Sequence, residues 1–435
     1  MRITIPTTGS RGDVQPYVAL GLGLQAAGHK VRLATHADFE DFVRSYGLDF
    51  HALEADARAL QASQAGDRML DAGRNPIVFI REFVRLREPV IRGIMRECYE
   101  ACRDADAVVF TTTTSLLGHT VAEKLGVPFY GSSLQPTGLS RCHASFLMPQ
   151  APEWLPGRGL YHLFTHIFVG MTLWQMWRPT FNAARKEVLG LPPLPVMGPG
   201  RDYLEPPLGL EGYSPLVVPR PHDWAAGRQL TGYWFLDPPP GWEPPPDLVD
   251  FLDAGSPPVY VGFGSNHHRD PAAVTELVVT ALKAAGVRGV LLTGWNGMAP
   301  VAPSDQFFPV DSVPHAWLFP RTAAVVHHGG AGSTAAGLRA GVPSVVVPFT
   351  SDQPFWGHRV RRLGAGPAPV PRKQLTAGRL EHAVRQAVSD EAMRGRAAEV
   401  GRLMRAEDGV GRAVALFQRY AVPVAGRRGP ALGAA

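Results

Sequence analysis

Hydrophobic positions along the chain follow two alternating patterns. Short runs of apolar and β-branched residues predict buried strands, and longer stretches with apolar residues at helical spacing predict helices between them. The first helical stretch covers 14–27, with Pro16 in its first turn and Gly28 at its end. In the first half of the chain the predicted strands are 2–6, 31–34, 107–112 and 127–131. This alternation predicts a parallel sheet covered by helices on both faces.

The second half of the chain repeats the alternation after a proline-rich interruption. Prolines are dense over 192–246, where they exclude a buried helix and leave room for short strands, one of them at 232–235. The predicted strands of the second half are 259–262, 290–293, 324–327 and 344–347. We therefore expect an α/β protein with two Rossmann-like domains whose parallel sheets face each other across a cleft. The expected units are a first domain at 1–205, a linker at 206–228, a second domain at 229–405, a C-terminal helix at 406–424 and a disordered tail at 425–435.

Composition excludes several classes of protein. Hydrophobic residues make up 45% and charged residues 19% of the 435 residues, a globular mixture in which each half can bury a core. The net charge of +5 comes with scattered arginines, so we do not expect a nucleic-acid partner. The spacing of the three cysteines fits neither a disulfide framework nor a zinc site, which favours a reducing compartment. The first residues lead directly into a strand without the apolar region of a signal peptide, so we expect a cytoplasmic protein.

One amphipathic stretch, 159–177, carries a wide apolar stripe. Phe164, Phe168 and Trp174 lie on this stripe and are candidates for an apolar pocket that holds a small molecule. Polar residues within the stretch argue against a membrane-spanning helix, although its apolar face could rest on a membrane surface. A helix buried in the core of the first domain is the alternative interpretation.

The most informative motif is the loop His328-Gly-Gly-Ala-Gly-Ser-Thr334, which lies between a predicted strand and a predicted helix. Its glycines allow a ligand to approach the backbone closely, and the free N–H groups at the helix start favour an anion. We therefore predict a phosphate site made by His328, Gly330, Gly332, Ser333 and Thr334. The spacing of the glycines does not match the dinucleotide-binding fingerprint. A tight turn with an ordinary helix cap is the alternative.

Further candidates follow other predicted strands of the second domain. Gly264 and Ser265 could also cradle phosphate, and Trp295 could form a wall against a base or a sugar. Asp352 and Gln353 follow the last strand. Because a carboxylate beside a pyrophosphate would be repelled, we expect this pair to bind neutral sugar hydroxyls. A helix cap is the alternative role for Asp352.

In the first domain, the loop after the first strand contains Ser10-Arg11-Gly12-Asp13. Asp13 stands where a helix begins, so it can cap that helix, and at the mouth of the cleft its carboxylate could also take a proton from a hydroxyl. Burial would raise its pKa and strengthen it as a base. Ser10, Arg11 and Gly12 would support the loop or contact phosphate. We expect no metal site, because no cluster of histidines and carboxylates demands one.

Together these motifs resemble the sterol 3-β-glucosyltransferase family of the two-lobed GT-B fold. The resemblance covers nearly the whole chain and is most specific over 318–371, which contains the His-Gly-Gly-Ala-Gly core and the sequence Asp352-Gln-Pro-Phe-Trp-Gly. The segments 9–16 and 261–265 are similar to the same family. High usage of Arg, Ala, Gly and Pro suits a bacterial member, of actinobacterial source.

The resemblance implies an inverting transfer of glucose from UDP-glucose to a hydroxyl of a sterol or a similar apolar small molecule. The first domain would bind the acceptor, with Asp13 as general base, and the second domain would bind the donor without a metal or other cofactor. Such an acceptor would fit peripheral contact with a membrane. The expected donor contacts are Val313 and His315 for uracil, Ser265 and 328–334 for the diphosphate, and Asp352 and Gln353 for glucose.

Two alternatives stay open. Natural-product glycosyltransferases, which act on macrolides or polyketides with UDP- or dTDP-sugars, share the His-Gly-Gly-Ala-Gly core, but Phe355-Trp356-Gly357 favours the sterol branch. A GT-B sugar-nucleotide epimerase would need no apolar acceptor pocket, and a non-catalytic partner would usually lose the base or the Asp-Gln pair. The chain also departs from the family at Ala336, where plant relatives carry a glutamate that holds ribose, so no residue is assigned to ribose.

Overall fold

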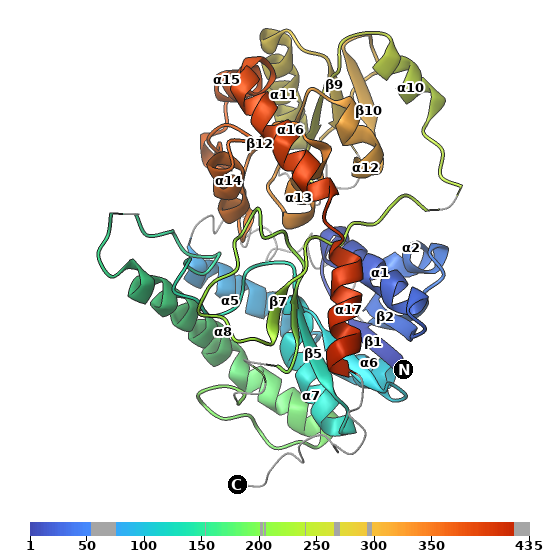
Figure 1. Ribbon diagram of the computed structural model, residues 1–435, viewed down its shortest axis with the longest axis vertical. Helices are drawn as coiled ribbons and strands as arrows, with labels where there is room; N and C mark the ends of the chain where they lie inside the picture. The colour runs from blue at the N-terminus through green and yellow to red at the C-terminus, as the bar shows by residue number, and fades with distance from the viewer. Residues whose placement is uncertain are drawn as a thin grey trace.

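The computed structural model describes residues 1–53, 75–152, 154–200, 203, 206–239, 241–264, 270–293 and 298–421. These residues form two lobes, each built on a parallel sheet with helices on both faces (Figure 1). The two sheets confirm the α/β class and the two-lobed arrangement that the sequence predicts.

The first lobe contains a seven-stranded sheet in the order β3-β2-β1-β4-β5-β6-β7, with every pair of neighbours parallel. Its strands are β1 (Arg2–Pro6), β2 (Lys30–His36), β3 (Asp49–Leu53), β4 (Ala107–Phe110), β5 (Phe129–Ser133), β6 (Gly209–Glu211) and β7 (Arg228–Leu230). Its helices are α1 (Arg11–Ala26), α2 (Glu40–Ser45), α5 (Pro76–Arg87), α6 (Ile91–Cys102), α7 (Ser115–Leu125) and α8 (Arg158–Leu189), with 3-10 turns η1 (Ala37–Phe39) and η2 (Thr112–Thr114). One face of the sheet packs on α1, and the other packs on α5 to α8.

The second lobe contains a five-stranded sheet in the order β10-β9-β8-β11-β12, again parallel throughout. Its strands are β8 (Val259–Gly262), β9 (Gly289–Leu292), β10 (Phe307–Val310), β11 (Ala324–His327) and β12 (Ser344–Val346). Its helices are α10 (Pro246–Asp253), α11 (Pro271–Ala285), α12 (His315–Leu318), α13 (Ala331–Ala340), α14 (Gln353–Arg362), α15 (Ala377–Ser389) and α16 (Glu391–Arg405), with 3-10 turns η3 (Phe319–Arg321) and η4 (Arg372–Gln374). Strands β8 and β11 have the bounds that the apolar runs predict.

The expected linker at 206–228 contacts both lobes: part of it joins the first sheet, and its buried residues Tyr213, Val217, Val218 and Trp224 pack against α13, α14 and α16 of the second lobe. Strand β6 lies inside that range and pairs with β5, and β7 begins at Arg228 and pairs with β6. Residues 232–235, which the sequence predicts as a strand, form none in the structure. Strands of three residues carry too little periodicity to be located from sequence, and β7 lies at the edge of the sheet.

The C-terminal helix α17 (Gly409–Ala421) returns to the first lobe, where Figure 1 shows it beside α1 and β1. Its buried residues Ala413, Val414 and Phe417 pack into the same core as α1. The helix therefore fastens the end of the second lobe to the first. No helix within the described ranges combines the length and the apolar character needed to cross a membrane.

Candidate active site

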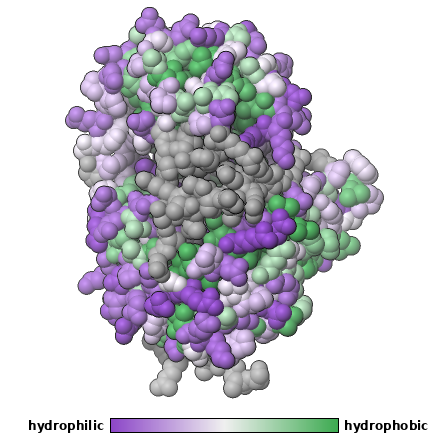
Figure 2. Space-filling model, turned by 180° about the vertical axis from the view of Figure 1, so that it is seen from behind, coloured by the Kyte–Doolittle hydropathy of each residue, from purple (hydrophilic) through white to green (hydrophobic). Residues whose placement is uncertain are grey.

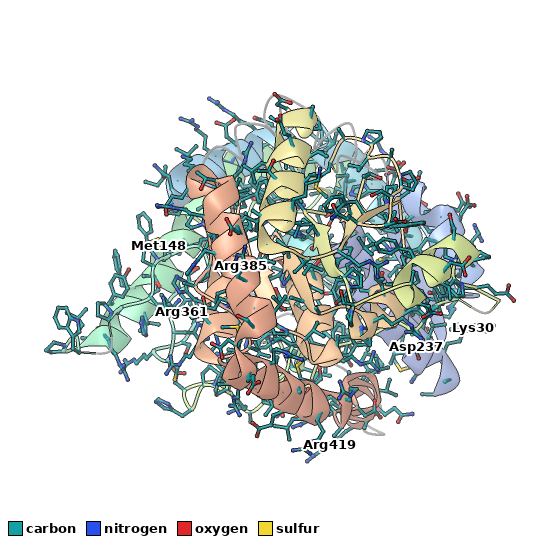
Figure 3. All side chains as sticks on the ribbon, turned by 90° about the horizontal axis from the view of Figure 1, so that it is seen from above. Lys30, Met148, Asp237, Arg361, Arg385 and Arg419 are labelled. Atoms are coloured by element: carbon teal, nitrogen blue, oxygen red, sulfur yellow. The ribbon has the colours of Figure 1, made fainter. Side chains whose placement is uncertain are left out.

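A cleft with a volume of about 1650 Å³ lies between the two lobes and is lined by residues of both. The carboxyl ends of both sheets open onto it, which is the position where ligands bind in open α/β folds. Seen from above, Met148 near α8 and the cleft residue Asp237 lie on opposite sides of the molecule (Figure 3). The predicted site residues that line the cleft are Ser10, Arg11, Gly12, Asp13, Trp174, Gly264, Val313, His315, His328, Gly330, Gly332, Ser333, Asp352 and Gln353.

The loop between β11 and α13 places backbone N–H groups and one imidazole at the cleft wall. Gly330 caps α13, and the Gly329 N–H donates to His327 Nδ1 at 3.0 Å. A Cβ atom on Gly330 would lie 2.4 Å from His328 Nε2, and one on Gly264 would lie 2.8 Å from His328 Cε1. Glycine is therefore required at both positions for the ring to fit. An anion at this helix start would meet free N–H groups and the positive end of the helix dipole.

His328 is a neutral hydrogen-bonding group, because burial lowers its pKa to about 4. Its Nδ1 atom is buried and has no hydrogen-bond partner among the described residues.

Thr334 differs from the expectation for this loop. Its side chain is fully buried behind the loop, its Oγ1 atom likewise lacks a partner within the described ranges, and it does not line the cleft. Thr334 occupies the fourth position of α13, and its side chain is buried away from the cleft.

A small aromatic stack forms the cleft wall near Val313 and His315. The His315 ring stacks on Phe319 with centroids 4.2 Å apart and an interplanar angle of 17°. Tyr260 Oη lies 3.5 Å from His315 Nε2. Burial lowers the pKa of His315 to about 4, so its ring is neutral and presents a flat surface suited to a nucleobase. Ser265 and Trp295 lie outside the described residues.

Asp352 and Gln353 lie at the start of α14. The Trp356 Nε1 atom donates to Asp352 Oδ2 at 2.8 Å, and burial raises the pKa of this carboxyl to about 6. Gln353 Oε1 accepts from the N–H groups of Phe349 and Thr350 at 2.7 and 3.1 Å, so its oxygen shapes the loop. Both side chains line the cleft.

The loop before α14 holds an unusual backbone conformation. Ser351 has a φ of 59°, and it is the one non-glycine residue with a positive φ in the described part of the chain. This conformation costs a residue with a side chain of order 1 kcal/mol and is common where a loop contacts a ligand. Ser351 itself lines the cleft beside Asp352.

Asp13 combines a structural role with a position in the cleft. Its Oδ2 atom accepts from Ser10 N at 2.9 Å and from Ser10 Oγ at 3.1 Å, which closes the first turn of α1 as a capping box. Gly9 approaches so closely, with a φ of 132°, that a Cβ atom there would lie 2.4 Å from Asp13 Oδ2. Burial raises the pKa of the Asp13 carboxyl, while the bonds from Ser10 and the charge of Arg87 lower it.

The first-lobe side of the cleft is an apolar chamber with α8 along one wall. Ile167, Gly170 and Trp174 line it at helical spacing, and Trp174 Nε1 donates to Val196 O at 2.9 Å. Phe164 and Phe168 do not line the cleft: their rings stack 5.9 Å apart on a neighbouring face of the helix, and Phe164 is 58% exposed. Only part of the apolar stripe of α8 lines the cleft, and the sequence alone did not identify which part.

The sequence interpretation missed the contribution of α5 to this chamber. Phe79, Phe83 and Leu86 of that helix, which packs against α8, line the cleft together with Arg87. The signals for this helix are nevertheless present: Asn75 Oδ1 accepts from Ile77 N and Val78 N, and Pro76 occupies the first position. Among the residues that the structure describes, no group of three or more His, Cys, Asp and Glu side chains is placed to hold a metal ion.

Comparison with protein families matches both halves of this cleft. Residues 3–141 match the glycosyltransferase family 28 N-terminal domain, and residues 303–410 match the erythromycin biosynthesis protein CIII-like, C-terminal domain. Two sterol 3-beta-glucosyltransferases of Arabidopsis thaliana are each 36% identical over 97% of the chain, which covers 66% and 68% of their lengths. A sterol 3-beta-glucosyltransferase of Cryptococcus neoformans is 35% identical over 96% of the chain, which spans only 27% of that protein.

Solved structures share the fold at lower sequence identity. The glycotransferase of kitacinnamycin superposes with a TM-score of 0.67 at 21% identity, covering 96% of this chain and 98% of that one. The glycosyltransferase SnogD from Streptomyces nogalater gives a TM-score of 0.64 at 21% identity, covering 96% and 99%. The chain is thus a two-lobed GT-B glycosyltransferase, and it belongs to the sterol 3-beta-glucosyltransferase family.

Proposed function

We propose that this protein transfers glucose from UDP-glucose to the hydroxyl of a sterol or a similar apolar small molecule, with inversion at the sugar carbon. The observation that carries the proposal is the position of Asp13. It lines one continuous cleft together with the donor loops of the second lobe and the apolar chamber of the first lobe. A base between these two regions can meet an acceptor hydroxyl and a donor sugar at once.

The second lobe would hold the donor. The N–H groups at the start of α13 and the neutral His328 ring would bind the diphosphate, and the wall at Val313 and His315 would lie beside the uracil. Asp352 and Gln353 would face the glucose hydroxyls, with Arg11 and Ser10 approaching from the first lobe. In this proposal the helix start and hydrogen bonds stabilise the leaving diphosphate, so the donor needs no metal ion.

The reaction then follows as a single displacement. Asp13 takes the proton of the acceptor hydroxyl while that oxygen attacks the anomeric carbon of glucose. The bond from this carbon to the diphosphate breaks on the opposite side, so its configuration inverts and UDP leaves with the electron pair. Burial of Asp13 strengthens it as a base, and the hydrogen bonds from Ser10 hold it in place.

The acceptor would lie in the apolar chamber with its hydroxyl toward Asp13. Aromatic and aliphatic side chains from α5 and α8 form the chamber, which fits an extended hydrophobic skeleton. The Arabidopsis relatives are named as sterol 3-beta-glucosyltransferases, and this supports a sterol. High usage of Arg, Ala, Gly and Pro supports a bacterial origin for this family member.

Peripheral membrane contact is part of the proposal. Leu160, Phe164 and Ile167 are 65%, 58% and 48% exposed along one face of α8, and Figure 2 shows hydrophobic residues on the side of the lower lobe where this helix runs. Such a face would let the enzyme collect an apolar acceptor from a bilayer surface. In a vesicle sedimentation assay, we expect Phe164→Glu to reduce binding, and equal sedimentation of both proteins would refute the contact.

A natural-product acceptor with a dTDP-sugar is the second candidate. The solved relatives with similar folds include a glycosyltransferase, VinC, in complex with DTDP, which supports a thymidine nucleotide as an alternative donor. A mixed panel separates the candidates: the protein is incubated with UDP-glucose or dTDP-glucose and with sterols and macrolides together, and products are identified by mass spectrometry. We expect hexosylated sterols with UDP-glucose. Products on macrolides alone would contradict the sterol proposal, and no hexosylated product at all would contradict glycosyl transfer.

A further inference from the structure

Arg87, at the end of α5, is a partly buried cation that lies within electrostatic reach of Asp13. Its Nη1 atom donates to the carbonyl oxygen of Thr113 at 2.8 Å, and its guanidinium lies 4.3 Å from the centre of the Phe83 ring. Both contacts fix the group in the cleft wall, which Arg87 and Asp13 line together. The sequence motifs gave no indication of this residue.

The anchor of Arg87 also touches the loop that carries Asp13. Thr113 Oγ1 accepts from Thr8 N at 3.3 Å, so one residue holds the guanidinium through its carbonyl and the loop through its hydroxyl. The two charges influence each other: Arg87 lowers the pKa of Asp13, and Asp13 raises the pKa of Arg87, which burial alone would lower further. The cation therefore offsets part of the desolvation of the carboxylate, in addition to the hydrogen bonds from Ser10.

Other charged and titratable groups face Asp13 from the surrounding elements. Asp352 at the start of α14 interacts with it unfavourably as a second carboxylate, and Tyr17 on α1 is a neutral phenol whose pKa burial raises above the usual range. His36 at the end of β2 contacts the same loop, where its Nε2 accepts from Gly9 N at 3.2 Å. The two hydrogen bonds from Ser10 contribute most to lowering the pKa of Asp13, and the charge of Arg87 lowers it further.

We propose that Arg87 is a positioning residue that holds Asp13 as a carboxylate in the cleft between the lobes, so that a base is available when the acceptor hydroxyl arrives. The proposal rests on the proposed function, in which Asp13 takes the proton. A buried carboxylate without such a cation tends to become protonated and would then be no base. The chain thus combines a base whose affinity for protons is increased by burial with a fixed cation that keeps the base ionised.

The test is the pH dependence of kcat/KM for three variants with a saturating donor. Arg87→Gln removes the charge but keeps a donor for the Thr113 carbonyl, Arg87→Lys keeps the charge, and Arg85→Met is the control on the exposed side of the same helix. We expect the acidic limb of Arg87→Gln to move upward, because removal of an opposite charge raises the pKa of a carboxyl group. The rate above that limb should change little, and Arg87→Lys and Arg85→Met should keep the wild-type limb.

Two results would overturn the proposal. An unmoved acidic limb in Arg87→Gln, or an equal loss of activity at every pH, would assign Arg87 a merely structural role. Asp13→Asn provides the separate check on the proposed function. If that variant keeps near-normal transfer, the base assignment itself fails, whereas an inactive Asp13→Asn with an unmoved limb in Arg87→Gln removes only Arg87.

Discussion

Asp352 keeps a carboxyl group in a place where burial opposes its charge. The side chain is 9% exposed, and burial is the largest cause that raises its pKa to about 6, followed in the same direction by the charge of Asp13. The Trp356 indole N–H partly compensates. Such a conflict between stability and charge is typical of functional sites, and it supports a role for Asp352 in binding a sugar hydroxyl.

This conflict predicts a pH-dependent stability difference. Because the folded pKa lies above the unfolded value of 3.8, the stabilising contribution is complete below pH 3.8 and is lost as the pH rises through about 6. Asp352→Asn keeps an oxygen for the Trp356 N–H and removes the charge. We expect it to gain about 1–3 kcal/mol in unfolding free energy relative to the wild type between pH 4 and pH 8. Urea unfolding at both pH values measures this, with the exposed Asp305→Asn as control. An equal difference at both pH values would contradict the prediction.

At the scale of single residues, the sequence predicted which loop residues line the cleft but not which other residues contact those loops. The motifs at Asp13 and His328 carry recognisable residue types next to strand ends, and the structure places both in the cleft. Arg87 and Thr113 are brought to the Asp13 loop only by the packing of α5 against the sheet, which no local spacing reveals. The buried side chain of Thr334 shows the converse, since a motif residue can face the core.

Among the elements, α8 has the largest influence on the acceptor chamber. Its 32 residues run along the first lobe, and Gly170 faces the cleft near their middle. A Cβ atom at Gly170 would meet no heavy atom within 4 Å, so a side chain there would project into open space. Glycine in a helix interior lowers the stability of the helix. At this position its lack of a side chain leaves space in the cleft.

Filling this space predicts a selective loss of acceptor binding. We expect Gly170→Leu to raise the acceptor KM by on the order of tenfold or more, because the new side chain occupies volume that a rigid apolar acceptor needs. The affinity for UDP, measured by calorimetry, should not change, because the donor loops lie on the other lobe. Gly170→Ala is the matched control and should stabilise the helix by about 1 kcal/mol. A normal acceptor KM in Gly170→Leu would place the acceptor elsewhere.

The elements themselves were predictable wherever they were long or strongly apolar. Strands β8 and β11 match the predicted runs, and α17 was expected within a few residues of its bounds. Strands β3, β6, β7 and β10 were not located from the sequence: β10 contains Pro309, β6 follows Pro206 and Pro207, and β3 and β7 are short and contain charged or polar residues. Pairing with neighbouring strands determines where these strands form, and local sequence does not reveal this pairing.

At the scale of the whole molecule, the site exists only because two lobes meet. Asp13 belongs to the first lobe and Asp352 to the second, and their charges interact across the cleft. Helix α17 fastens this arrangement, since Phe417 follows the second lobe in sequence and is buried in the core of the first. The sequence predicted two domains and a cleft, but the packing of α17 depends on long-range contacts and could not be read from the chain.

The central claim is that Asp13 drives an inverting transfer of glucose to an apolar hydroxyl. Its most direct test is to incubate the wild type and Asp13→Asn with UDP-glucose and a sterol, and to determine the mass and the anomeric configuration of the product by mass spectrometry and NMR. We predict one added hexose in the β configuration, and a rate reduced by about 10²–10⁴-fold in Asp13→Asn, as for loss of a positioned base. An α-configured product, or transfer by Asp13→Asn at the wild-type rate, would contradict the account.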